Sequence, residues 1–236
     1  MVAGRRPELR VDPVLLYTPL AFGHEWLADA LNPLSRRALG DVYINAPGTS
    51  VELPGGRLTT MIGGVGAPAT VSGLEVAIAR GARRILFFGI CGSLQPDLKI
   101  GDLFAVEEAI REEGTSYHYL PADAPARATR ELLEAADMPR GVVWTTDAPF
   151  RETRTKAARF AAQGVLGVEM EVSAVYTLAQ YRGVEALALQ VVSDQLVGEK
   201  WTGITRETFR HRCDEAVRLL ADAGLNVPSP SERRPG

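Results

Sequence analysis

Residues 165–194 read VLGVEMEVSAVYTLAQYRGVEALALQVVSD, and this stretch decides the fold. An apolar run at 165–170 is followed by a helical pattern at 171–181 and by a second apolar run at 186–192. Short apolar runs separated by a helical pattern are typical of the alternation of strands and helices in α/β proteins. The stretch therefore predicts an α/β protein.

The same alternation extends towards both ends of the chain. RILFF at 84–88 is a continuous apolar run, as expected for a strand buried on both faces, and it leads into a predicted turn, GICG, at 89–92. The pattern predicts further strands at 14–17, 57–63, 102–107 and 141–145, and helices at 24–31, 70–80, 128–136 and 205–223. Such alternation predicts a mostly parallel or mixed sheet with helices on both faces.

The length and composition fit one folded unit. The chain has 236 residues, of which 46% are hydrophobic, and this is enough for one sizeable core. The polar or Pro/Gly-rich ends predict flexible tails at 1–10 and 226–236, which leaves a single domain at 11–225.

Charge and cysteine usage exclude several classes of protein. The formal net charge is −3, which gives no electrostatic footprint for a nucleic-acid partner. The two cysteines have no metal-ligand spacing, so we expect neither a metal nor a disulfide framework. No apolar run reaches about 18 residues, and the N-terminus lacks the apolar core of a signal peptide. We expect a cytoplasmic protein without a membrane partner.

Polar residues stand where predicted strands end, and this is where ligands gather in open α/β sheets. Glu169-Met170-Glu171 interrupts an otherwise apolar stretch. A carboxylate at such a junction is costly unless it is paired, and a sugar diol is a suitable partner because one carboxylate accepts from two hydroxyls. The alternative is an acid that caps the next helix.

Two further features could carry chemistry. Asp194 follows the strand at 186–192, where a partly buried aspartate can hold a proton for a leaving group; the alternative is an N-cap. Gly63-Gly64-Val65-Gly66 opens a predicted helix and could cradle a phosphate, although glycine-rich turns are common and the Walker and dinucleotide patterns are absent.

Taken together, these stretches resemble the nucleoside phosphorylase family, which includes uridine phosphorylase, bacterial purine nucleoside phosphorylase and the methylthioadenosine/adenosylhomocysteine nucleosidases. The matching segments cover residues from about 57 to 196. The resemblance implies a three-layer α/β/α sandwich around a central mixed, partly barrel-like sheet. It also implies a nucleoside substrate, no cofactor, and a homo-oligomer that is a dimer or a hexamer.

The resemblance assigns roles to residues of this chain. It implies that Met170 and Glu171 hold the ribose, that Phe150 lies near the base, and that Asp194 protonates a purine, so we expect a purine or purine-like base. The full set of expected substrate-binding residues is Val65, Gly66, Ile90, Cys91, Gly92, Phe150, Glu169, Met170, Glu171 and Ser193.

The chain departs from the family where phosphate would bind. The family's Gly-Asp-Pro-x-x-Arg loop is replaced by YTPLAFG at 17–23, which has no arginine. Phe87 stands in place of an arginine, Ile90 in place of a serine or threonine, and residues 44–49 lack the arginine that a neighbouring subunit would donate. Because charge-assisted bonds normally offset the desolvation of a phosphate dianion, these changes disfavour phosphorolysis.

Water is then the expected acceptor. Glu25 or His24, just after the first strand, could activate it while Asp194 protonates the base; the alternative for Glu25 is an exposed helix residue. The sequence therefore favours a hydrolase that cleaves the N-glycosidic bond of a nucleoside. Two alternatives stay open. One is a phosphate-dependent nucleoside phosphorylase, a glycosyltransferase with an atypical phosphate site, and the other is a repurposed member that binds or processes a nucleoside-like metabolite.

Overall fold

The computed structural model describes residues 9–20, 25–196, 202–203 and 206–228. Its strands are β1 (Val14–Thr18), β2 (Ser35–Tyr43), β3 (Ala46–Leu53), β4 (Gly56–Ile62), β5 (Arg84–Ser93), β6 (Leu103–Glu112), β7 (Ala126–Arg127), β8 (Arg140–Thr146), β9 (Gly167–Glu169), β10 (Glu185–Gln195) and β11 (Thr202–Gly203). Its helices are α1 (Trp26–Leu31), α2 (Ala67–Ala79), α3 (Arg130–Ala135), α4 (Arg154–Ala162), α5 (Val172–Arg182) and α6 (Arg206–Asn226), with two 3₁₀ turns, η1 (Ser116–His118) and η2 (Pro149–Arg151).

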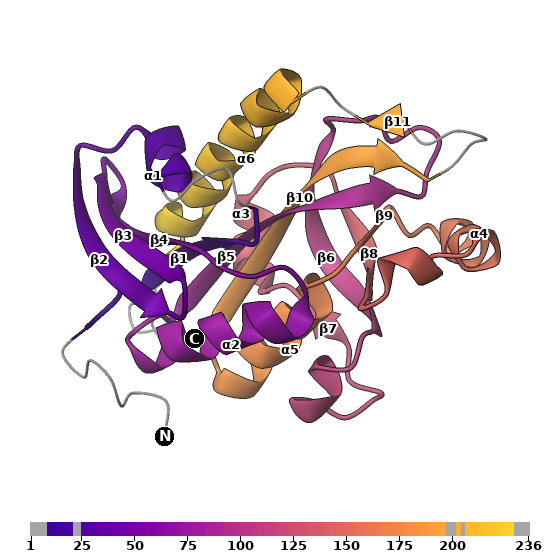
Figure 1. Cartoon of the computed structure of the whole chain (residues 1–236), viewed down its shortest axis with the longest axis horizontal. Helices are drawn as coiled ribbons and strands as arrows, with labels where there is room; N and C mark the ends of the chain where they lie inside the picture. The colour runs from indigo at the N-terminus through magenta and orange to yellow at the C-terminus, as the bar shows by residue number, and fades with distance from the viewer. Residues whose placement is uncertain (1–8, 21–24, 197–201, 204–205, 229–236) are drawn as a thin grey trace.

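All the strands belong to one mixed sheet, in the order β11-β10-β6-β8-β9-β5-β1-β4-β3-β2, with β7 paired to β6. An additional pairing joins β5 to β10. Since β10, β6, β8, β9 and β5 are also neighbours in that order, this pairing closes five strands into a ring. The expected mixed, partly barrel-like sheet is thus confirmed (Figure 1).

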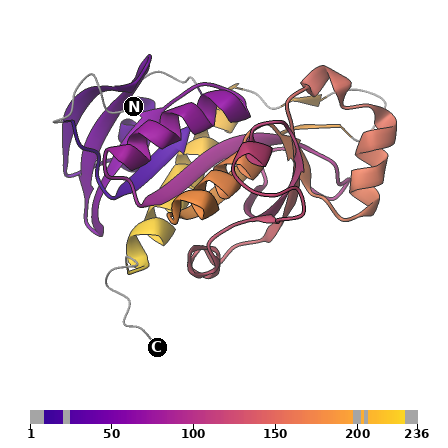
Figure 2. The same cartoon turned by 90° about the horizontal axis from the view of Figure 1, so that it is seen from below.

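Helices cover both faces of the sheet, which completes the three layers. Helices α2 and α5 pack together on one face, and α6 packs with α1 and α3 on the other (Figures 1 and 2). Alternation along β5 decides which side chain enters which layer. Ile85 and Phe87 join the cluster under α2 and α5, whereas Leu86 and Phe88 join the cluster under α6.

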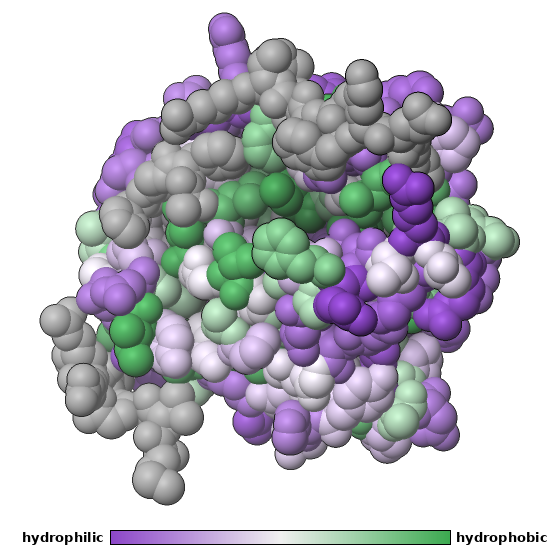
Figure 3. Space-filling view, turned by 45° about the vertical axis from the view of Figure 1, so that its right-hand side comes forward, coloured by the Kyte–Doolittle hydropathy of each residue, from purple (hydrophilic) through white to green (hydrophobic). Residues whose placement is uncertain are grey.

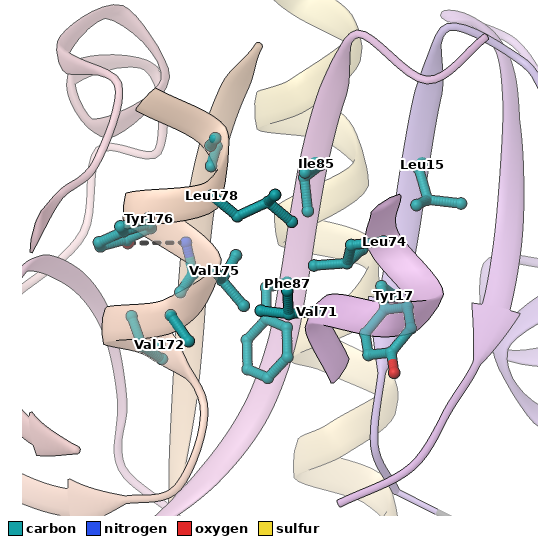
Figure 4. Close-up of a cluster of buried hydrophobic side chains, with 14 of the residues drawn as sticks. Leu15, Tyr17, Val71, Leu74, Ile85, Phe87, Val172, Val175, Tyr176 and Leu178 are labelled. Atoms are coloured by element: carbon teal, nitrogen blue, oxygen red, sulfur yellow. Dashed lines mark hydrogen bonds between the residues drawn. The ribbon is translucent and has the colours of Figure 1, made fainter. Parts of the chain in front are cut away.

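The cluster under α2 and α5 contains an aromatic pair from neighbouring strands. Tyr17 of β1 and Phe87 of β5 stack with ring centroids 6.0 Å apart, and both side chains are fully buried (Figure 4). Gly63 follows β4 and leaves room for this pair, because a Cβ there would lie 1.8 Å from the Tyr17 hydroxyl. The glycine-rich loop is therefore shaped in part by the packing of Tyr17.

A buried arginine joins the sheet to the end of the chain. Arg84, at the start of β5, pairs with Glu185 of β10 at 2.6 Å. Its guanidinium also donates to the backbone carbonyls of Gly224, Val227 and Pro228. The residues expected to begin a flexible tail at 226 are thus tied to the sheet as far as position 228.

The structure differs from the expected elements in several places. The expected turn at 89–92 is wrong, because β5 continues to Ser93 and pairs there with β9 and β10, which satisfies its backbone groups. The hairpin of β2 and β3 was not expected, since β2 is largely exposed and polar. Helix α4 was missed too.

Among the described helices, none is long and apolar enough to cross a membrane.

Candidate functional site

A cavity of about 300 Å³ opens where β5 and β10 approach their carboxyl ends and β9 pairs alongside. Figure 3 brings forward the side of the molecule towards which these strand ends point, and apolar surface gathers there in a hollow. The described residues that line the cavity are Pro19, Leu20, Val65, Ile90, Cys91, Gly92, Pro149, Glu152, Val168, Glu169, Met170, Glu171, Ser193, Asp194 and Leu196.

Gly92 lies at the centre of this arrangement. In register, it stands between Val168 of β9 and Asp194 of β10, next to a β-bulge in β10. A Cβ on Gly92 would lie 3.3 Å from Asp194 Oδ2 and 3.0 Å from Leu196 Cδ1. Glycine at this position therefore lets the Asp194 carboxylate lie close against β5.

Glu169 is fully enclosed and serves as the cap of α5. Its Oε2 accepts from the backbone amides of Glu171 at 2.7 Å and Val172 at 2.8 Å, and its Oε1 accepts from the Thr145 hydroxyl. Burial, and next the nearby charge of Glu171, raise the pKa of Glu169 to about 8. Glu169 therefore makes the contacts of a helix-capping acid, which is the alternative that the sequence left open.

This raised pKa gives a prediction for stability. The folded pKa of about 8 lies above the ordinary value of 4.5, so the proton on Glu169 stabilises the fold fully below pH 4.5, and that contribution is lost as the pH rises through 8. Glu169→Gln keeps an oxygen for both amides without the charge, and we expect it to flatten the fall in stability over this window. Urea unfolding at pH 5 and pH 8.5 measures this, and an unchanged pH dependence in the variant would contradict the assignment.

Glu171 makes a different set of contacts. It stands at the N-cap position of α5 but makes no capping bond there with its side chain. Its Oε1 instead accepts from the amide of Gly66 at 2.6 Å, at the N-cap of α2. Burial raises the pKa of Glu171, while the amides of Gly66 and Met170 favour its charged form. The N-terminus of α2 therefore receives an anion, but that anion is the carboxylate of Glu171.

Asp194 lies at the end of β10, the strand on the other side of β5 from β9. The hydroxyl of Ser193 contacts Asp194 Oδ1 at 2.5 Å and the carbonyl of Cys91 at 3.1 Å. Burial, followed by the charges of Glu169 and Asp194, raises the pKa of the Cys91 thiol well above its usual value, so Cys91 is a neutral wall residue. Asp194 is the carboxylate of this wall.

Glu152 is a further carboxylate of the cavity, and it was not among the residues expected to bind substrate. It follows the 3₁₀ turn η2 and lines the cavity with Pro149. Burial, and next the charge of Asp194, raise the pKa of Glu152 to about 7. The sequence signal available was weak, because Glu152 lies on a loop and only the return of that loop to β10 brings it to the site.

The side of the cavity where the family would hold phosphate is apolar. Pro19, Leu20, Val65 and Ile90 line it, and the described lining residues include no lysine, arginine or histidine. Phe87 is not part of the lining, because it points into the core and stacks on Tyr17.

Most of the expected site residues come together in this cavity, but two of the described ones, Phe150 and Glu25, do not. Gly66 lies at its edge through its bond to Glu171, whereas the side chain of Phe150 is fully exposed on η2 and does not line it. Glu25 is exposed and lies 3.5 Å from Arg36, which matches the alternative of a surface residue, and it does not line the cavity either. His24 lies outside the described residues.

Comparisons with known proteins identify the family of the chain. The family model described as "Phosphorylase superfamily" matches residues 45–226. A DeoD-type purine nucleoside phosphorylase of Myxococcus xanthus is 29% identical over 84% of this chain and 91% of its own length. A purine nucleoside phosphorylase of the same type from Bacillus cereus is 30% identical over 72% of this chain and 77% of its own. A guanosine phosphorylase of Halorubrum lacusprofundi is 29% identical over 70% and 75%.

A comparison with solved structures supports the fold. The crystal structure of uridine phosphorylase from Vibrio fischeri superimposes with a TM-score of 0.78 at 19% identity, covering 91% of this chain and 92% of that one. Since the family model spans more than half of the chain, and the Bacillus cereus relative is 30% identical over most of it, the resemblance seen in the sequence is confirmed. The chain is an enzyme of the nucleoside phosphorylase family, within the phosphorylase superfamily.

Proposed function

We propose that this enzyme cleaves the N-glycosidic bond of a purine nucleoside and transfers the ribosyl group to phosphate. The observation that carries the proposal is one cavity with Glu171 on one wall and Asp194 on another. The relatives named above are purine and guanosine phosphorylases, and they support phosphorolysis over the hydrolysis that the sequence favoured. The homo-oligomer that the resemblance implies stays a prediction.

In this proposal each wall has its own task. The carboxylate of Glu171, held in place by the Gly66 amide, accepts hydrogen bonds from the ribose hydroxyls. Asp194 donates a proton to the purine as its bond to the sugar breaks, because the base leaves poorly as an anion. Met170 and Val168 enclose the sugar and keep water away from the reacting carbon.

The acceptor half of the site has an apolar described lining. A phosphate in this cavity meets no basic side chain from the described residues, so among these residues it depends on neutral donors, namely backbone amides and the Ser193 hydroxyl. Such contacts offset less of the desolvation of a dianion than arginine does. We therefore expect a weak phosphate site, with saturation only at high phosphate concentration.

Hydrolysis is the second candidate, and the same apolar wall favours it. A cavity without cations in its described lining admits neutral water at a lower desolvation cost than a phosphate dianion. In that case the enzyme releases free ribose. The two candidates share the sugar and base contacts and differ only in the acceptor.

One experiment separates them. Phosphate-free enzyme is incubated with inosine, guanosine, adenosine and uridine, with and without added phosphate, and the sugar product is identified. We expect release of the purine base and formation of ribose 1-phosphate in proportion to added phosphate. Free ribose at an unchanged rate without phosphate would establish hydrolysis instead. If no base is released from any of the four nucleosides, both candidates are wrong.

A further inference from the structure

Two carboxyl groups from distant parts of the chain line the same cavity. Glu152 comes from the segment between η2 and α4, and Asp194 comes from the end of β10. Among the described residues, no hydrogen bond or ion pair is made to the Glu152 side chain, which is half-buried. A half-buried carboxyl that contacts no protein donor is available to a bound molecule.

On the cavity side, the described titratable groups around Glu152 are three carboxyl groups and one thiol, and none of them is basic. Asp194 of β10, Glu169 at the end of β9, Glu171 at the start of α5 and the Cys91 thiol of β5 line the cavity with it. On its own turn, Arg151 is exposed and does not line the cavity. No described cation therefore holds Glu152 in its charged form, and burial with the charge of Asp194 raises its pKa to about 7.

Purines differ at the edge that such a pair of carboxyl groups would meet. Both purine types present an acceptor at N7, which is the atom that Asp194 protonates under the proposed function. At the adjacent position 6, guanine presents an acceptor oxygen and adenine presents an amino donor. A carboxyl next to Asp194 is thus placed to distinguish the two, because it donates when protonated and only accepts when ionised.

We propose that Glu152 is the base-specificity residue of this site and that, beside Asp194, it reads position 6 of the purine. It donates to the oxygen of a 6-oxopurine as a carboxylic acid and accepts from the amino group of a 6-aminopurine as a carboxylate. This inference rests on the proposed function, since it takes the ligand to be a purine whose N7 meets Asp194.

The consequence is a preference that depends on pH. Below pH 7 Glu152 is mostly protonated and the cavity favours inosine or guanosine, whereas above pH 7 it is mostly ionised and the cavity favours adenosine. One mismatched hydrogen bond to a charged group changes an equilibrium or a rate constant by roughly tenfold or more. We therefore expect the ratio of kcat/KM for inosine to that for adenosine to fall about tenfold from pH 6 to pH 8.

The test compares this ratio in three proteins over the same pH range. Glu152→Gln carries an amide that donates and accepts at every pH, so its ratio should not change with pH. Arg154→Gln alters an exposed residue at the start of α4 and should behave like the unmodified enzyme. Proton donation by Asp194 affects both substrates and cancels in the ratio. A ratio that does not vary with pH in the unmodified enzyme, or that varies equally in Glu152→Gln, would overturn the proposal.

Binding measurements keep this test separate from the proposed function. If neither nucleoside is cleaved, the proposed function fails, and calorimetric affinities for hypoxanthine and adenine at pH 6 and pH 8 then decide about Glu152. A hypoxanthine-to-adenine affinity ratio that falls with pH in the unmodified enzyme and stays constant in Glu152→Gln would support the assignment. Equal ratios in both proteins would contradict it.

Discussion

Asp194→Asn is expected to lower kcat for inosine and guanosine by roughly 10²- to 10⁴-fold, the usual contribution of a positioned general acid. Asparagine has nearly the same shape and can still accept from the Ser193 hydroxyl, so the close packing against Gly92 is kept. What it lacks is a transferable proton. Because the loss is one of chemistry, KM should change much less than kcat, and steady-state kinetics on both nucleosides measures this.

A substrate that needs no proton provides the control. In 7-methylguanosine the base already carries a positive charge and leaves without protonation at N7. The Asp194→Asn variant should therefore cleave 7-methylguanosine at a rate close to that of the unmodified enzyme. Equal losses on both substrates would mean that Asp194 supports the structure and is not the acid. Ser193→Ala, which removes only the neighbouring hydroxyl, should cost far less than Asp194→Asn.

Glu171→Gln is expected to lower kcat/KM for ribonucleosides by roughly 10²-fold or more, as for the loss of one or two hydrogen bonds to a charged group. The glutamine oxygen can still accept from the Gly66 amide, so the start of α2 should stay in place. The negative charge that would bind the ribose hydroxyls, and that would stabilise positive charge on the sugar as the bond breaks, is removed.

Two controls show whether Glu171 acts on the sugar. A 2′-deoxynucleoside lacks one hydroxyl, so the variant should lose less activity on it than on the ribonucleoside. Glu108→Gln changes a partly exposed glutamate that pairs with Arg127 on the sheet, away from the cavity lining, and its kcat/KM should match that of the unmodified enzyme. If Glu171→Gln loses as much activity on the deoxynucleoside as on the ribonucleoside, Glu171 does not bind the 2′-hydroxyl.

The sequence predicted the centre of the sheet well, because that centre is encoded locally. The runs at 84–88 and 186–192 form strands with helices on both faces, and their unbroken apolar character already requires burial on both sides. Strand β2 escaped prediction because its residues are mostly exposed and polar, so its pairing with β3 leaves no apolar pattern. The turn expected at 89–92 was wrong. Two of these four residues are glycines, and glycine can mark a turn or allow close packing between strands, as Gly92 does.

The carboxylates of the site could be predicted where they stand at or next to the end of a strand. Glu169, Glu171 and Asp194 were found from polar groups that interrupt apolar runs, and all three line the cavity. Their separate contacts could not be predicted, since the capping of α5 by Glu169 and the bond from Gly66 to Glu171 depend on how distant segments meet. Glu152 lies on a loop, and no local pattern distinguishes it from a surface glutamate.

The pairing of Arg84 with the end of α6 has a consequence for how the protein is made. Arg84 is in the first half of the chain, but the carbonyls that satisfy its buried guanidinium belong to residues 224, 227 and 228. Until those residues have been synthesised, a sheet that closes around Arg84 would bury its charge with Glu185 present but without these three carbonyl partners. A buried charge that lacks part of its partners is costly. Folding during translation should therefore halt before the sheet centre closes, and a chain cut short near 223 should accumulate as an incompletely folded, aggregation-prone species.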